Sequence, residues 1–393
     1  MSRFSSLLAA LWLCAAPAAP AAAQEIVITF GGDTNFAGNR ETPLPDAVRR
    51  WQLHSLPEMT VNLRPEWDGD VNFVNVETVV AERDGNPQWG KQFVFRSHPG
   101  QFRHLIEAGV HAFALANNHA MDHGRPGLAA TLAFFRSEDS PANPLLVAGI
   151  GAGQAAFRPK VITVKGVRIA LSALSFGSGS FAPTEAQAGM AYLAHYDQVL
   201  AALAETPADI KMLSIHYGTE NAITLEWTQA DFFRRAVAEA GVNLVIGHHS
   251  HVVRAVEARP ADDAAIFYSL GNFLFIGGAG KDARPLGHDY GLMGKAYFSF
   301  DGTRARLAAL EAVPLKGVHM IPHPPLPDRA AATIEHLNGL SSQSVGDLAA
   351  RFRVTDVKRP RGVACYGGPY GPRARAQCCT VERSLHCDLP DLM

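Results

Sequence analysis

The sequence predicts an α/β protein, and two observations support this fold class. Short β-branched segments alternate with segments of helical period from Gln24 to about Leu315. The composition is that of an ordinary globular protein, with 47% hydrophobic and 18% charged residues. The 393 residues suffice for one large domain or two smaller ones. We therefore expect a sheet with helices on both of its sides.

The predicted elements follow one another in a regular order. The predicted strands are residues 26–30, 71–76, 110–115, 161–164, 167–174, 210–215, 242–246, 266–269 and 295–300. The predicted helices between them are residues 99–108, 125–136, 195–203 and 228–240. No internal repeat of fixed period is visible, so we expect a single α/β unit over residues 24–320.

The first 23 residues have the features of a cleavable signal peptide: Arg3, an apolar stretch over 7–16 and a small-residue end at 21–23. An uncleaved anchor is the alternative, but the apolar stretch is short for a membrane span. A lipid anchor on Cys14 is disfavoured because the two residues before it are bulky. We expect an exported protein located in the periplasm or cell envelope.

The overall charge excludes some classes of partner. With 35 Lys and Arg against 37 Asp and Glu, the formal net charge is −2, which does not favour a dedicated nucleic-acid binder. The only long apolar run is at the start of the chain, which argues against a polytopic membrane protein.

The C-terminal region differs in composition from the rest. The sequence IPHPPLPD over residues 321–328 predicts a break between the main domain and a proline-rich linker with a cysteine-rich tail, residues 321–393. In an oxidising location the four cysteines of this tail predict two disulfides. Geometry disfavours a bond between adjacent cysteines, so two of the three connectivities remain open. A zinc knuckle with His386 is the alternative, although its spacing fits no zinc pattern well. The cysteines are Cys365, Cys378, Cys379 and Cys387.

Five predicted strands are each followed by a residue that can bind a metal ion. In an open α/β sheet, ligands bind outside the carboxyl ends of the strands, so these side chains can meet in one crevice. Imidazole nitrogens mixed with carboxylate or amide oxygens suit Mn, Zn, Fe or Ni, and the absence of cysteine argues for a catalytic site. Six ligands are enough for one ion or for two ions bridged by a carboxylate, with Asp33 as the candidate bridge. The candidates are Asp33, Glu77, Asn118, His216, His249 and His251.

Taken singly, several of these residues have ordinary explanations. Asp33 could cap a helix or turn, and His216 could be a hydrogen-bonded core histidine. The three histidines within residues 248–251 are harder to explain in this way. If this segment stays extended, His249 and His251 point to the same face.

The motifs GGDTNF, VNFVNVET, ALANNHAMDHGRPGL, IHYGTE, VIGHHSHVV and YSLGNF together resemble the CapA family of bacterial poly-γ-glutamate capsule synthesis proteins. Their order also resembles the ligand series of the calcineurin-like metallophosphoesterase superfamily. The resemblance covers about residues 26–275 and implies a metallophosphatase-like two-sheet sandwich flanked by helices, followed here by a small cysteine-containing tail.

The resemblance also implies roles for individual residues. The six candidates above would bind the metal, and His119 would protonate a leaving group or stabilise developing negative charge. Residues implied to support the ligands or to contact substrate are Asn117, Asp122, Glu220, His248 and Asn272. Two departures concern one metal position: the phosphoesterases have His where this chain has Asn35, and Gly-Asp where it has Val76-Glu77. A single or weakly bound ion therefore remains open.

The resemblance implies a function in capsule biosynthesis. We expect a divalent-metal-dependent hydrolase or transferase that acts on an anionic polymer such as poly-γ-glutamate, or on its linkage. The alternatives are a non-catalytic assembly or anchoring factor that contacts membrane capsule-synthesis proteins, and a secreted metallophosphoesterase. Binding of an anionic polymer predicts clustered positive charge near the crevice, with Lys91, Arg96, Arg103 and Arg125 as candidates.

Overall fold

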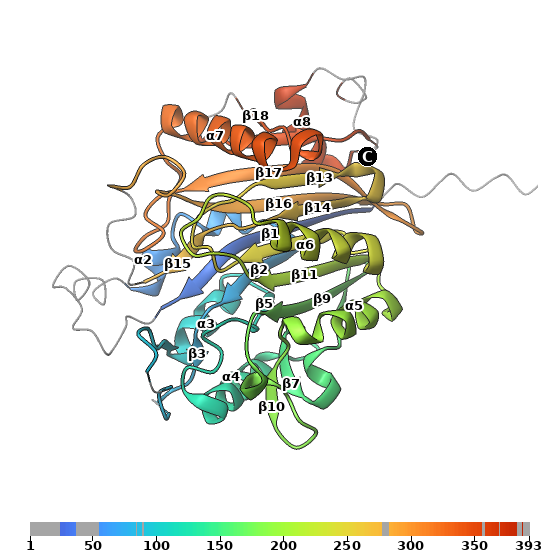
Figure 1. The fold of residues 1–393 in the computed structure, drawn as a ribbon. Coiled ribbons are helices and arrows are strands. Elements are labelled where there is room, and N and C mark those ends of the chain that lie inside the picture. The colour runs from blue at the N-terminus through green and yellow to red at the C-terminus, as the bar shows by residue number, and fades with distance from the viewer. Residues whose placement is uncertain are drawn as a thin grey trace, which may run out of the picture.

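Two β-sheets stacked face to face form the centre of the molecule, and helices pack around them (Figure 1). The computed structural model describes residues 24–36, 55–83, 85–88, 90–276, 283–355, 358–368, 370–382 and 387. The α/β class predicted from the strand and helix pattern is confirmed. Two main sheets are present, as the family resemblance implied, whereas the alternation pattern alone predicts one.

The first sheet has nine strands in the order β18-β19-β17-β16-β1-β2-β5-β6, with β15 beside β1. Strands β2, β5, β6 and β15 run parallel to their neighbours, whereas β16 to β19 are antiparallel. The bounds are β1 Gln24–Asn35, β2 Val71–Val76, β5 Ala112–Ala114, β6 Leu146–Ala148, β15 Asn272–Phe275, β16 Gly291–Phe300, β17 Ala305–Leu315, β18 Arg353–Val354 and β19 Gly362–Cys365.

The second sheet has six strands in the order β13-β14-β12-β11-β9-β8, and its central strands β14, β12, β11 and β9 are parallel. Its bounds are β8 Lys160–Val164, β9 Val167–Ser175, β11 Ile210–His216, β12 Leu244–His248, β13 Val256–Arg259 and β14 Ala264–Phe267. Two short strand pairs lie outside these sheets: β3 Val79–Val80 with β4 Arg96–Ser97, and β7 Ile150–Ala152 with β10 Ala188–Met190.

Helices pack on both sheets. In α4, Phe135 contacts Phe113 of β5 and Phe102 of α3, whereas α5 packs on β9 and α6 on β12 and β14. Helix α7 contacts β13 and β17, so it joins the two sheets at one edge. The bounds are α2 Leu56–Thr60, α3 Pro99–Glu107, α4 Gly124–Glu138, α5 Tyr196–Glu205, α6 Trp227–Ala240, α7 Pro327–Val345 and α8 Pro372–Val381.

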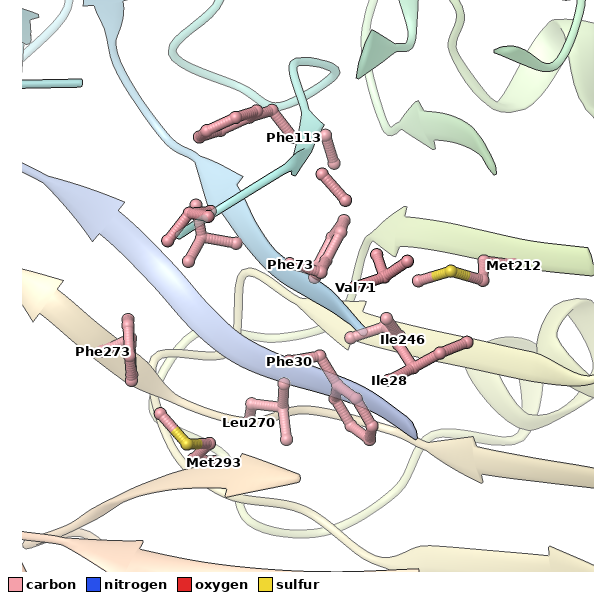
Figure 2. Packing of buried hydrophobic residues seen from close by; sticks show 14 of the residues in the cluster. Ile28, Phe30, Val71, Phe73, Phe113, Met212, Ile246, Leu270, Phe273 and Met293 are labelled. Carbon is pink, nitrogen blue, oxygen red and sulfur yellow. The ribbon is translucent and has the colours of Figure 1, made fainter. Parts of the chain in front are cut away.

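Side chains from the facing surfaces of the sheets form the main core. Figure 2 shows Ile28, Phe30 and Phe73 of the first sheet near Met212 and Ile246 of the second. Alternation along β1 explains this placement, because residues two apart share a face. Burial of each such side chain contributes about 1.5–3 kcal/mol. The core thus holds the carboxyl ends of strands from both sheets in a fixed relation.

All nine predicted strands and all four predicted helices overlap observed elements. The longest strand that was not predicted is β17, whose sequence ARLAALEAVPL is rich in alanine. Such a sequence lacks the β-branched pattern of a strand. Pairing with β16 on one side and β19 on the other stabilises it as a strand.

The C-terminal region differs from the expected linker and tail. Helix α7 begins at Pro327, inside the proline-rich segment, because proline is favoured in the first turn of a helix. Strand β19 then pairs with β17, so this region extends the first sheet instead of forming a separate unit.

The predicted disulfides are confirmed, and the structure selects one of the two open connectivities. Cys365 bonds to Cys378 and Cys379 bonds to Cys387, so the first bond ties β19 to α8. The alternative of a zinc knuckle is excluded, because none of these four thiols remains to bind an ion.

The predicted signal peptide, residues 1–23, lies outside the described residues. Among the helices that the structure does describe, none has the length and apolar character needed to cross a membrane.

Candidate metal centre

The six predicted ligands lie at the carboxyl ends of strands from both sheets. In the first sheet, Asp33 lies in β1, Glu77 directly follows β2 and Asn118 follows β5. In the second sheet, His216 ends β11, and the segment 248–251 begins at the last residue of β12 and continues beyond it. Within each sheet these ligand-bearing strands run parallel to one another, so their carboxyl ends meet at one edge of the sandwich. The first sheet supplies oxygen ligands and the second supplies imidazoles.

Glu77 lies at the centre of this group. Its Oε1 is 3.8 Å from His119 Nε2, 3.6 Å from His216 Nε2 and 3.8 Å from His251 Nε2. Both carboxylate oxygens are buried, and neither accepts a hydrogen bond from the described residues. A buried carboxylate without a donor or cation is strongly unfavourable, so this arrangement indicates a site for a positive charge.

Two overlapping sets of side chains have the spacing of metal ligands. One set is Glu77, His249 and His251, and the other is Asp33, Glu77 and His216; within each set the ligand atoms lie within 4.8 Å of one another. Glu77 belongs to both sets, whereas we expected Asp33 to be the shared carboxylate. The Oδ1 atom of Asn118 lies 2.9 Å from His216 Nε2, beside the second set.

Asp33 and Glu77 differ in their hydrogen bonding. Asp33 Oδ1 accepts a bond from Asn75 Nδ2 at 2.8 Å, and its Oδ2 accepts one from the backbone N–H of His249 at 3.2 Å. Burial acts to raise the pKa of Asp33, but the nearby histidines, led by His248, hold it well below its usual range. Burial and the charge of Asp33 instead raise the pKa of Glu77 well above its usual range.

Burial favours the metal-binding form of two candidate imidazoles, His216 and His249. Burial lowers the pKa of His216 well below its usual range and lowers the pKa of His249 to about 4. Neutral imidazoles have a free ring nitrogen, which is the form required for coordination.

The segment after β12 is not extended, contrary to our expectation for His249 and His251. Both residues have positive φ, 85° for His249 and 55° for His251, so the chain turns directly after the strand. Such a backbone is uncommon for a residue with a side chain and requires support from its surroundings. The hydrogen bond from His249 N–H to Asp33 supplies part of that support.

His119 lies against the same site. Its Nδ1 is 2.6 Å from Asp122 Oδ2, which also accepts the backbone N–H of Phe95, and Lys91 Nζ donates to Asp122 Oδ1 at 2.5 Å. This carboxylate directs Nε2 of His119 toward Glu77. Burial lowers the pKa of His119, although Asp122 opposes the change.

The remaining predicted residues take different positions. Asn117 donates to Val76 O and accepts from His119 N–H, which shapes the loop between them. His248 is buried with Nδ1 3.3 Å from Asp33 Oδ1, and Asn272 Oδ1 lies 2.7 Å from His251 Nδ1. Glu220 is exposed, but its charge contributes to the raised pKa of Glu77.

The four basic side chains expected near the crevice have different hydrogen-bond partners. Lys91 contacts the site, but Arg96 binds Ala81 O, Arg103 binds Glu138 and Arg125 binds carbonyls that include Ala188 O.

Neither Asn75 nor His319 was predicted from the sequence as a residue of the site. A signal for Asn75 was available, because it precedes Glu77 by two positions and the period of a strand places both on one side. Three unpredicted phenylalanines also pack on the histidines: ring centroids are 4.2 Å apart for Phe95 and His119, 4.5 Å for Phe176 and His249, and 5.1 Å for Phe275 and His251.

Several known proteins are similar to this chain. The PGA biosynthesis protein CapA of Bacillus subtilis is 29% identical over 205 residues, which cover 51% of this chain and 52% of that protein. The capsule biosynthesis protein CapA of Bacillus anthracis is 30% identical over 180 residues, covering 43% of this chain and 41% of that protein. The chain thus spans about half the length or less of these relatives.

A solved phosphatase from Mycoplasma pneumoniae aligns over 75% of this chain and 94% of its own, at 15% identity and a TM-score of 0.44. The calcineurin-like phosphoesterase YfkN of Bacillus subtilis aligns over 82% of this chain and 98% of its own, at 11% identity and a TM-score of 0.40.

The family model of the bacterial capsule synthesis protein PGA_cap matches residues 27–276, which contain all six candidate ligands. This match confirms the family predicted from the motifs. The chain belongs to the PGA_cap family of bacterial capsule synthesis proteins.

Proposed function

We propose that this chain is an exported, divalent-metal-dependent hydrolase or transferase that acts on an anionic polymer of the cell envelope, such as poly-γ-glutamate, or on its linkage. The observation that carries the proposal is the buried Glu77 carboxylate, which has imidazoles around it and no hydrogen-bond donor in the part of the chain that the structure describes. The names of the two Bacillus relatives, which refer to PGA and capsule biosynthesis, support the substrate class.

The donor set fits one or two divalent ions. Asp33, Glu77 and His216 would hold one ion, Glu77 with His249 and His251 would hold another, and Asn118 lies beside His216. Mixed nitrogen and oxygen donors suit Mn, Zn, Fe or Ni. A bound divalent cation would supply Lewis-acid activation of the bond that is attacked and of water.

Other residues of the chain have roles that follow from their contacts. Asp122 accepts a hydrogen bond from Nδ1–H of His119. Nε2 of His119 can therefore accept a proton at the site and return it to a leaving group. Lys91 is 23% exposed and lies beside His119, where its charge would attract an anionic substrate. The three phenylalanines exclude water from the imidazoles they cover, which strengthens electrostatic interactions there.

Metal analysis of the purified protein tests the proposed centre. We expect the wild type to carry a divalent metal and the double variant His249→Ala/His251→Ala to lose most of it. The control is His104→Ala/His336→Ala, which removes two histidines from α3 and α7. Equal, low metal content in the wild type and the first double variant would refute the metal centre.

Substrate assays separate the functional alternatives. Poly-γ-glutamate chain length and release of nitrophenol from a phosphodiester would be measured with metal-loaded wild type and His119→Ala. Cleavage of the polymer alone supports the proposal, whereas cleavage of the phosphodiester alone supports a metallophosphoesterase. If metal binds and neither bond breaks, a capsule assembly factor that contacts membrane synthesis proteins becomes the better explanation.

Export is tested separately with a reporter that is active only in the periplasm. Fusion after residue 30 should give activity, and deletion of residues 2–23 should abolish it. Activity that does not depend on these residues would contradict the proposed signal peptide.

A further inference from the structure

We propose that His319 is a positioning residue that fixes, through Asn272, which ring nitrogen of His251 faces the metal centre. The inference rests on the proposed function, because it assigns His251 as a ligand. His319 lies beyond residues 27–276, the part of the chain that the family model matches. It would therefore be a contribution to the site from outside the matched segment.

The first link of the relay determines the hydrogen on His319. Its Nδ1 lies 2.7 Å from the backbone oxygen of Phe275. A carbonyl oxygen only accepts hydrogen bonds, so Nδ1 carries the hydrogen. In a neutral imidazole the other nitrogen, Nε2, then has a free lone pair and acts as an acceptor.

The second link determines the orientation of the Asn272 amide. Nδ2 of Asn272 lies 3.4 Å from Nε2 of His319, so the amide donates to the lone pair. The amide oxygen then faces the opposite way, 2.7 Å from His251 Nδ1. The opposite orientation of the amide would direct an N–H group at His251, and the bond to His319 favours the orientation observed.

The third link concerns the candidate ligand itself. The oxygen of Asn272 only accepts, as does Asp33 Oδ2 at 3.5 Å from the same nitrogen, so Nδ1 of His251 carries the hydrogen and the lone pair is on Nε2. That Nε2 lies 3.8 Å from Glu77 Oε1. Partners of this kind set the tautomer and orientation of metal-binding histidines.

The backbone holds the relay in place. Asn272 and His319 are both buried, and Asn272 pairs with Asp33 in the register of β15 and β1. The loop that carries His319 is fixed to β15, because Phe275 N–H donates to Val318 O at 2.9 Å. The relay thus connects the turn after β17 to the strand beside Asp33.

Zinc titration of metal-free protein tests the proposal. His319→Phe fills the buried space but forms no hydrogen bond, and we expect it to weaken zinc binding by about 10- to 100-fold. His319→Gln keeps one donor and one acceptor and should retain most of the affinity. The matched control is His323→Phe, because His323 is exposed and its Nδ1 also lies near a backbone carbonyl, Pro324 O, at 3.0 Å. Zinc binding by His319→Phe equal to that of the wild type would overturn the proposal.

Nitrogen-15 NMR of histidine-labelled, metal-free protein provides a readout that does not require metal binding. We expect His251 to be in the Nδ1–H tautomer in the wild type and in His319→Gln, and to become a mixture in His319→Phe. If the wild type binds no zinc, the metal centre fails, while the relay is still decided by these spectra. An unchanged tautomer in a folded His319→Phe protein would refute the relay.

Discussion

Two buried glutamates in the first half of the chain have opposite surroundings. Glu66, 3% exposed, receives two hydrogen bonds of 3.0 Å from the Arg361 guanidinium and lies 3.3 Å from Lys295 Nζ. Glu77, fully buried, receives no hydrogen bond from any residue that the structure describes and has imidazoles as its neighbours. Their pKa values move accordingly: Arg361 and Lys295 overcome burial and lower the pKa of Glu66, whereas burial raises that of Glu77.

This difference separates a structural carboxylate from a binding one. Glu66 is a buried carboxylate whose positive partners are side chains of the chain itself. One of them, Arg361, lies in the C-terminal region. At the candidate metal centre, the described side chains next to the Glu77 carboxylate are imidazoles, and the nearby Lys91 pairs with Asp122 instead, so we propose that a bound cation supplies the balancing charge. Four predictions test this distinction, in order of decreasing expected effect.

Removing the guanidinium from the structural cluster should have the largest effect. Arg361→Met leaves Glu66 and Glu311 buried with fewer partners, and we expect the free energy of unfolding to fall by about 3–5 kcal/mol. Urea denaturation measures the change. Arg351→Met is the control, because Arg351 is 81% exposed and its loss should leave stability unchanged. Similar stability of the two variants would contradict the structural role of Arg361.

Adding metal should stabilise the protein through Glu77 and not through Glu66. At a zinc concentration about 100 times the dissociation constant, linkage predicts about 2.7 kcal/mol of added stability for the wild type. Glu77→Gln should lose most of this gain, whereas Glu66→Gln should keep it. Thermal unfolding with zinc and with a chelator measures the difference, and equal gains in both variants would show that Glu77 does not bind the ion.

In metal-free protein, Glu77→Gln should stabilise the fold, whereas most substitutions of buried residues destabilise it. Replacing a buried carboxylate that has no donor with a neutral amide should raise the free energy of unfolding by about 1–3 kcal/mol at neutral pH. Glu66→Gln, which breaks the pairs with Arg361, should instead lower it. Urea denaturation of both chelator-treated variants compares the signs, and destabilisation by Glu77→Gln would contradict this account.

The pH dependence should show the smallest effect. Because the folded-state pKa of Glu66 lies below its ordinary value of 4.5, its stabilisation is present above pH 4.5 and is lost as the pH falls through the folded value. The stability difference between wild type and Glu66→Gln should therefore shrink between about pH 7 and about pH 3. The pKa of Glu77 is raised, so its effect on stability has the opposite pH dependence. In metal-free protein, the contribution of Glu77 to stability is present at low pH and is lost as the pH rises through the folded-state pKa. A Glu66 difference independent of pH would contradict the assignment.

Much of the fold and of the ligand set could be predicted from local patterns. The β-branched runs marked strands such as β2 and β11, and the polar residues at or directly after their ends included Glu77 and His216. These signals are local, because side-chain alternation and turn chemistry act over a few residues. The motif order was specific enough to identify the family.

Other features arise only when distant segments meet. The alanine-rich β17 is a strand because β16 and β19 pair with it, and Arg361 reaches Glu66 across 295 positions of sequence. The turn at His249 and His251 has positive φ that Asp33, 216 positions from His249, helps to hold.

By itself, the sequence determined the α/β class, the family and the identity of the residues that follow the strands, because each depends on short-range pattern or motif order. The tertiary structure decided that two sheets present these residues at one edge, that Glu77 belongs to both ligand sets, and that His319 reaches Asn272. These depend on contacts between segments far apart in the chain, whose geometry is set by packing of the whole core.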